Sequence, residues 1–163
     1  GWMRGELQVF EEHLYSETVQ TLLRQAINQL PQPSVRNRPR VLLTTFPQEQ
    51  HGLGLLMVES LLCLDGCTCV SLGVQTPIRD IVMAAKAHQA QVIALSFSLA
   101  FNPNQVLDGL AELRAQIDPN VEIWAGGRSG ILQRREVPGV TILSDLKDLA
   151  QHVERWRKAH PSL

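Results

Sequence analysis

Several features of secreted, membrane-embedded and nucleic-acid-binding proteins are missing from this sequence of 163 residues. The longest apolar stretch, at 53–64, is interrupted by Glu59 and falls short of the roughly 20 residues that a membrane helix needs. Fifteen Lys and Arg against sixteen Asp and Glu give a net charge of -1, which excludes the basic field behind non-specific nucleic-acid binding. The first residues show no signal peptide. We therefore expect a cytoplasmic protein without membrane contact, whose DNA binding, if any, belongs to another segment.

Cysteine is also scarce, and its spacing excludes a disulfide framework. The three residues, Cys63, Cys67 and Cys69, are odd in number and close together, which favours a reducing compartment. Cys67 and Cys69 alternate onto one face of a predicted strand, so we expect small buried hydrophobic side chains and not a zinc site. A hydrophobic content of 44% excludes disorder and suffices for one compact domain with an additional helix.

An amphipathic helix is predicted over residues 7–30, where apolar side chains recur three or four residues apart. Pro31 and Pro33 end it, and the proline- and arginine-containing segment that follows is typical of a linker. We place a boundary near residue 35, which divides the chain into 1–34 and 35–163. A lone helix cannot bury so wide an apolar face, so its partner is the following domain, a second copy, or bundle helices missing upstream. We favour missing helices, and since Met is not the first residue we expect a fragment.

After Pro39 short β-rich runs alternate with helical runs, about five times. We predict strands at 41–45, 68–72, 92–96, 121–125 and 140–143. We predict helices at 53–64, 78–90, 104–117, near 131, and at 145–158. This pattern predicts an α/β fold with a flavodoxin-like (Rossmann-like) five-stranded parallel sheet in the order 2-1-3-4-5.

Such a sheet binds ligands at the carboxyl ends of its strands, which directs attention to the loops 46–54, 96–102 and 126–130. The sequence lacks the residues that the usual ligands of this fold require. Gly52-Leu53-Gly54 lacks the third glycine of a dinucleotide fingerprint, and no acid follows the second strand. The strand ends also lack the acids of a phosphate-accepting receiver, and no Gly-Lys-Ser or Gly-Lys-Thr of a P-loop occurs.

The first loop contains Glu49 two residues before His51, in a glycine-rich segment. Neutral imidazole is the commonest metal ligand in proteins, and a carboxylate that accepts its second N–H fixes the orientation of the ring. This pair therefore indicates a metal ligand with an orienting partner, although a solvated loop histidine gives the same pattern.

Three separated elements together resemble the signature of the cobalamin-binding domain, which is D-x-H-x-x-G, then S-x-L or S-x-T, then Gly-Gly. This chain carries the corresponding residues at matching intervals: Glu49, His51, Gly52, Leu53 and Gly54, then Ser96, Phe97 and Ser98, then Gly126 and Gly127. The resemblance implies that His51 is the lower ligand of cobalt. It also implies that the nucleotide tail of cobalamin lies in a slot floored by small residues, a role that suits glycine because it permits close approach. Glu49 replaces the usual Asp, and Ser98 stands where Leu or Thr is commoner.

The resemblance extends upstream to MerR-type, light-responsive transcription regulators that depend on cobalamin. Their helical bundle carries W-x9-E-H, and here Trp2 precedes Glu12-His13 at that spacing. The resemblance implies adenosylcobalamin as the cofactor, with Trp2 and Glu12 near its upper face and His13 as a second cobalt ligand after light breaks the cobalt–carbon bond. It further implies a homo-oligomer, tetrameric in the intact regulator, and DNA binding by a winged helix absent from this chain.

Two alternatives stay open. A corrinoid carrier subunit of a methyltransferase shares the His51 loop and a preceding helical bundle, and a winged-helix segment upstream would distinguish the regulator from it. A regulator domain that has lost the corrin and acts through protein contacts alone fits the departures at Glu49 and Ser98. We expect a sensor and not an enzyme.

Overall fold

The computed structural model describes residues 17–29 and 37–161. Five parallel strands form one sheet in the order β2-β1-β3-β4-β5, which confirms the predicted topology. The strands are β1 Arg40–Thr44, β2 Thr68–Ser71, β3 Val92–Phe97, β4 Glu122–Gly127 and β5 Val140–Leu143. The helices are α2 Leu53–Leu64, α3 Ile78–Ala87, α4 Pro103–Gln116, α5 Ile131–Arg134 and α6 Leu149–Ala159, with the 3-10 turn η1 Leu146–Asp148 before α6.

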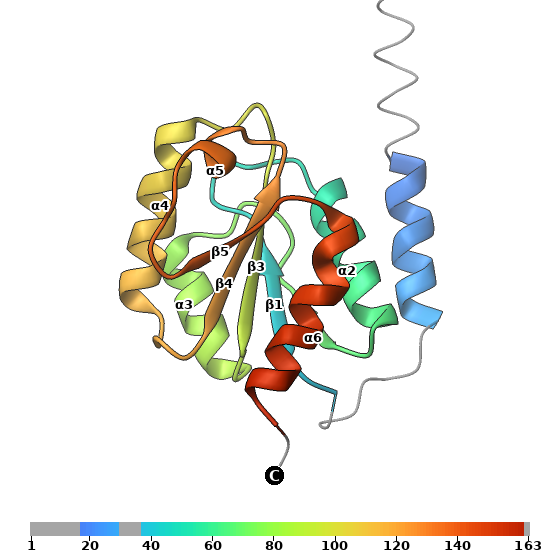
Figure 1. The fold of residues 1–163 in the computed structure, drawn as a ribbon. Helices are drawn as coiled ribbons and strands as arrows, with labels where there is room; N and C mark the ends of the chain where they lie inside the picture. The colour runs from blue at the N-terminus through green and yellow to red at the C-terminus, as the bar shows by residue number, and fades with distance from the viewer. Residues whose placement is uncertain (1–16, 30–36, 162–163) are drawn as a thin grey trace, which may run out of the picture.

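The sheet is covered on both faces, as crossover connections between parallel strands require (Figure 1). Helices α3 and α4 pack on one face through Ile81, Leu110 and neighbouring apolar residues. Helices α2 and α6 pack on the other face, where Leu62, Val153 and Trp156 meet the strands. Burial on both faces explains why β1 and β3 read as continuous apolar runs and not as an alternating pattern.

Local sequence explains where several helices begin and end. The side chain of Asn102 accepts a hydrogen bond of 2.9 Å from the Asn104 N–H, and Pro103 occupies the first turn of α4. Helix α2 ends before Gly66, which adopts φ +84 and turns the chain towards β2. The predicted terminal helix is divided, because the Asp145 side chain caps the turn η1 before α6 starts.

A further helix covers residues 17–29 and lies beside α2 on the side away from the sheet (Figure 1). It is the described part of the amphipathic helix predicted over 7–30. Leu22 on this helix is 58% exposed, so part of its apolar face has no cover within the described residues. The boundary predicted near residue 35 lies outside them. No helix in the described ranges combines the length and apolar character that a membrane span needs.

Candidate functional site

The loop after β1 brings His51 and Glu49 together at the carboxyl edge of the sheet. His51 Nδ1 lies 3.1 Å from Glu49 Oε1. The two side chains differ sharply in exposure, because His51 is 66% exposed and Glu49 is 2% exposed. A buried carboxylate therefore holds one nitrogen of an imidazole ring that faces outward.

Contacts from three directions fix Glu49 in place. Its second carboxylate oxygen accepts a 3.0 Å hydrogen bond from Ser98 Oγ, in the loop after β3. Its carbonyl accepts a 2.9 Å bond from Thr45 Oγ1, and its N–H donates 3.0 Å to the Phe46 carbonyl. With the carboxylate ionised, Nδ1 of His51 carries the proton, so Nε2 is the nitrogen that can bind a metal.

The loop is anchored from behind by an aromatic contact. The Phe46 ring is 2% exposed and meets the Phe97 ring edge-on, with 5.1 Å between their centres. On α4, Gly109 leaves room for the Phe46 ring, and a methyl group at that position would collide with it. Phe97 is thus a core residue at the base of the site, and its side chain is only 1% exposed.

A cavity of about 570 Å³ opens between the sheet and the helices α2 and α6. Its lining includes four of the small residues that the sequence placed there: Gly54, Ser96, Gly126 and Gly127. A Cβ at Gly54 would stand 3.1 Å from Ser96 Oγ, so any larger residue at position 54 would narrow the cavity. Gly127 has φ +114, and a side chain there would collide with the Phe97 carbonyl. Small side chains at these positions keep the cavity open as a slot.

A second loop, after β2, borders the His51 loop and was missed by the sequence analysis. Thr44 Oγ1 donates to the Gly73 carbonyl over 2.9 Å, and the Gln75 N–H donates to Thr45 Oγ1 over 2.8 Å. The consecutive threonines at the end of β1 could have signalled this connection, because β2 is the neighbour of β1 and its carboxyl end lies at the same edge. Val74 in this loop and Leu99 after β3 are 37% and 73% exposed.

The remaining predicted site residues fall into three groups. Gly52 and Leu53 mark the start of α2, directly after His51. Trp2, Glu12 and His13 lie outside the described residues. Ser98 lies beside Glu49 and is not among the residues that line the slot, unlike Ser96.

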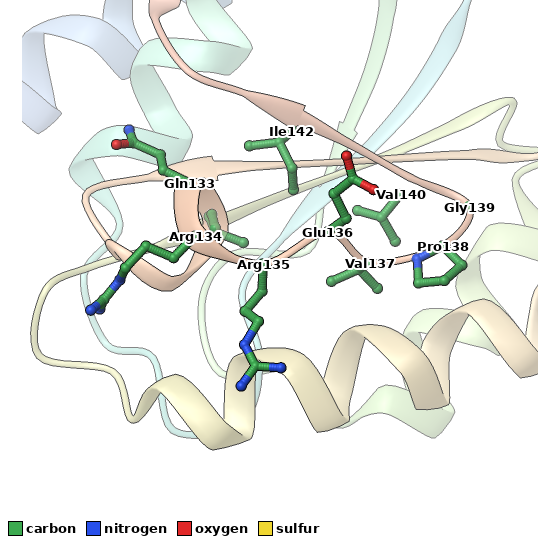
Figure 2. Close-up of a pocket in the computed structure, with 10 residues that line it drawn as sticks. Gln133, Arg134, Arg135, Glu136, Val137, Pro138, Gly139, Val140 and Ile142 are labelled. Carbon is green, nitrogen blue, oxygen red and sulfur yellow. The ribbon is translucent and has the colours of Figure 1, made fainter.

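A separate cavity of about 740 Å³ lies beside the segment from α5 to β5 (Figure 2). The apolar side chains of Val137, Val140 and Ile142 line it, while Arg134 and Arg135 extend away from them (Figure 2). None of the motif residues lines it. The candidate site is therefore the edge of the sheet that carries His51, together with the slot, because the motif residues lie there.

Residues 39–143 match the family described as the B12 binding domain. The chain belongs to this family. The matched segment includes the Glu49–His51 pair, the loop after β2, and the four small residues of the slot, Gly54, Ser96, Gly126 and Gly127.

Over 126 residues this chain is 31% identical to the HTH-type transcriptional repressor CarH of Myxococcus xanthus. The matched region covers 77% of this chain and 41% of the repressor. It is 30% identical over 93 residues to glutamate mutase sigma subunit 1 of Haloarcula marismortui, covering 57% and 61% of the two chains. The chain thus spans less than two thirds of either relative. A cobalamin-binding protein from Desulfitobacterium hafniense has the same fold, with a TM-score of 0.63, 20% identity, and coverage of 93% of this chain and 75% of that one.

The residues present fit cobalamin on three observations. His51 offers one exposed imidazole, and the described residues contain no cluster of three or more His, Cys, Asp or Glu that would form a complete metal site of their own. This suits a cobalt ion that the corrin already surrounds. The exposed apolar side chains of Val74 and Leu99 flank the histidine loop and suit the face of a large ring. The slot has a volume of about 570 Å³, and small residues line part of it.

Elsewhere, Cys67 is buried as the sequence predicted, whereas Cys69 is only half-buried, and two histidines pack against tryptophan rings. Cys67 is buried, and burial raises its thiol pKa to about 11. His152 lies 6.0 Å from the Trp124 ring, and burial lowers its pKa. His160 stacks on Trp156 at 4.1 Å. The tryptophans of β4 and α6 partly cover these two histidines.

Proposed function

We propose that the chain is the cobalamin-binding sensory part of a transcriptional regulator and that it binds without catalysing a reaction. The observation that carries the proposal is the buried Glu49 carboxylate 3.1 Å from Nδ1 of an exposed His51. The 31% identity to a transcriptional repressor supports the regulatory role. The MerR-type regulators that the sequence resembles support light as the signal.

In this proposal His51 would hold the cobalt of cobalamin through Nε2, and Glu49 would hold the imidazole ring in one orientation. The slot beside Gly54, Ser96, Gly126 and Gly127 receives the nucleotide tail. Bound adenosylcobalamin supplies a cobalt–carbon bond that light can break. Trp2 and Glu12 would contact the bound cofactor, and His13 would serve as a second cobalt ligand after illumination.

The proposed division of labour follows the predicted domains. Residues 1–34 contribute to a helical bundle over the upper face, and residues 35–163 form the cobalamin-binding domain. The two-state element of the switch is the position of the bundle over the cofactor. Illumination changes the contacts of the bundle and so favours one of its two positions. Assembly into a homo-oligomer and DNA binding by a winged helix outside this chain depend on that position.

The visible absorption spectrum tests the proposal most directly. The purified protein is mixed with adenosylcobalamin in the dark, washed free of excess cofactor, and measured before and after green illumination. We expect a retained cofactor with a base-off, histidine-on spectrum that changes with light into a stable second form. Failure to retain the cofactor would contradict the proposal and leave a domain that acts through protein contacts alone.

The second candidate is a corrinoid-carrying subunit of an enzyme, such as a methyltransferase carrier. The 30% identity to glutamate mutase sigma subunit 1 favours a role of this class. A carrier would retain cobalamin with the histidine-on spectrum in the dark. It would show no stable light state, and the His13→Ala variant would have the same spectrum after illumination as the unaltered protein.

A further inference from the structure

One hydroxyl group, that of Thr45, connects two loops at the edge that carries His51. Thr45 follows β1 and is completely buried. Its Oγ1 donates to the Glu49 carbonyl over 2.9 Å and accepts the Gln75 N–H over 2.8 Å. A hydroxyl can donate and accept at once, and valine, which has the same shape, can do neither. The loop of His51 and the loop after β2 therefore share one hydrogen-bonding atom.

The loop after β2 is held in a single conformation by further bonds to the end of β1. The Thr76 N–H donates to the Thr45 carbonyl over 3.0 Å. Thr44 Oγ1 and Thr76 Oγ1 are 2.6 Å apart, and because the Thr44 hydroxyl donates to Gly73, Thr76 donates in this bond. Gln75 adopts φ 60, in the left-handed region that residues other than glycine rarely occupy. Such backbone persists where surrounding contacts hold it, and here those contacts come from the two threonines.

These bonds set the position of exposed side chains next to the histidine. A Cβ at Gly52 would stand 3.1 Å from Val74 Cγ1, so the two loops touch directly behind His51. Val74 and Gln75 are exposed on the same edge as the imidazole ring. A ring bound to His51 would extend over this loop. The edge of the corrin carries amide groups, which the side-chain amide of Gln75 can pair with.

We propose that Thr45 is a positioning residue for cobalamin, and that the loop 73–76 is part of the seat of the corrin ring. Because Thr45 is completely buried, it would not touch the cofactor itself. It acts through Glu49, whose backbone it fixes, and through Gln75, whose strained conformation it holds. This inference rests on the proposed binding of cobalamin to His51.

The test compares three variants by their binding of hydroxocobalamin. Thr45→Val keeps the shape and removes both hydrogen bonds, and Thr45→Ser keeps the hydroxyl. Thr141→Val makes the same exchange on β5, at the far edge of the sheet. We expect Thr45→Val to bind about tenfold more weakly, because each lost bond contributes roughly a fivefold factor or less. Thr45→Ser and Thr141→Val should bind within about twofold of the unaltered protein.

A spectroscopic readout separates positioning from general stability. At saturating cofactor, Thr45→Val should show a mixture of histidine-on and histidine-off spectra, whereas Thr45→Ser should show the histidine-on form. Thermal unfolding without cofactor shows whether Thr45→Val is folded. If Thr45→Val binds as tightly as Thr141→Val and has the same spectrum as the unaltered protein, the inference is overturned and the proposed function stands. If the unaltered protein does not bind, both are overturned.

A measurement on the unaltered protein decides the matter should Thr45→Val fail to fold. Amide hydrogen exchange is followed by mass spectrometry with and without hydroxocobalamin. We expect the cofactor to slow exchange in peptides covering 73–76 as well as in those covering 46–52. Protection confined to 46–52 would overturn the role of the second loop.

Discussion

Glu49 and His51 are two residues apart, yet one is 2% exposed and the other 66% exposed, with 3.1 Å between Oε1 and Nδ1. A buried negative charge is costly unless hydrogen bonds compensate it, and here Ser98 Oγ supplies a second bond of 3.0 Å. The carboxylate is therefore aligned before any metal arrives, and it determines which ring nitrogen is free.

The first prediction concerns this carboxylate. Glu49→Gln keeps the shape of the side chain but offers one oxygen in place of two and loses the charge. Loss of such an outer-shell partner typically weakens metal affinity about 10- to 100-fold. We expect that decrease in the affinity for cobalamin, measured by spectroscopic titration. Ser98→Ala removes one bond and should weaken binding less, and equal affinity of Glu49→Gln and the unaltered protein would exclude the orienting role.

The second prediction concerns the ligand itself. His51→Ala should abolish the histidine-on spectrum and weaken cobalamin binding by more than Glu49→Gln does, because the bond to cobalt is lost as well. His88→Ala is a matched control, since His88 is exposed at the end of α3. A His51→Ala protein with an unchanged spectrum would remove His51 from the site.

The third prediction uses the slot. Ser96→Leu places a larger side chain in the cavity of about 570 Å³, opposite Gly54. Because the space is open, we expect the domain to fold and to lose affinity for cobalamin. Cobinamide lacks the nucleotide tail and should bind Ser96→Leu and the unaltered protein alike. If the variant binds both ligands normally, the tail lies elsewhere.

The fold was predicted well because it depends on patterns that a sequence displays. The apolar runs at 41–45 and 92–96 are the central strands β1 and β3. The predicted strand order puts the loop of His51 at the carboxyl edge of the sheet, where the structure has it. Glu49 and His51 were found because both lie within one short loop.

Contacts between distant segments were not predicted. The bond from Ser98 to Glu49 and the bond from Gln75 to Thr45 join residues 49 and 30 positions apart. They depend on strand register and loop conformation, which hydrophobic periodicity does not encode. The left-handed backbone at Gln75 gives no signal either, because glycine and asparagine are the usual residues there.

The fourth prediction is a pH dependence of stability. Burial raises the pKa of Glu59 on α2, although the Arg24 guanidinium on the helix 17–29 opposes the shift. The folded state therefore holds this proton more tightly than the unfolded state, so its stabilising effect is present at low pH and is lost as the pH rises through the raised pKa. We expect Glu59→Gln to raise the melting temperature at about pH 7 and to have less effect at about pH 4. Glu112→Gln, at an exposed position on α4, is the control. An equal effect at both pH values would contradict the prediction.

The fifth prediction ranks the thiols by reactivity. A hydrogen bond from Cys69 lowers the pKa of Cys63, whereas burial raises the pKa of Cys67 to about 11. Because the thiolate is the nucleophile, iodoacetamide should modify Cys63 before Cys67. Mass spectrometry of a time course measures this order, and Cys69→Ala should slow the labelling of Cys63. Faster labelling of Cys67 would be incompatible with this arrangement.

The contact between Arg38 and α6, at the start of the sheet domain, bears on how such a domain can be reused. Arg38 lies over the Trp156 ring at 5.1 Å, and Arg157 Nε donates 2.9 Å to the Arg38 carbonyl. The chain therefore enters the sheet next to the end of α6, at the edge opposite His51 (Figure 1). A domain whose entry and exit adjoin can be inserted into different proteins as a cassette without disturbing its ligand edge. That architecture is consistent with the appearance of related chains in a repressor and in a mutase subunit.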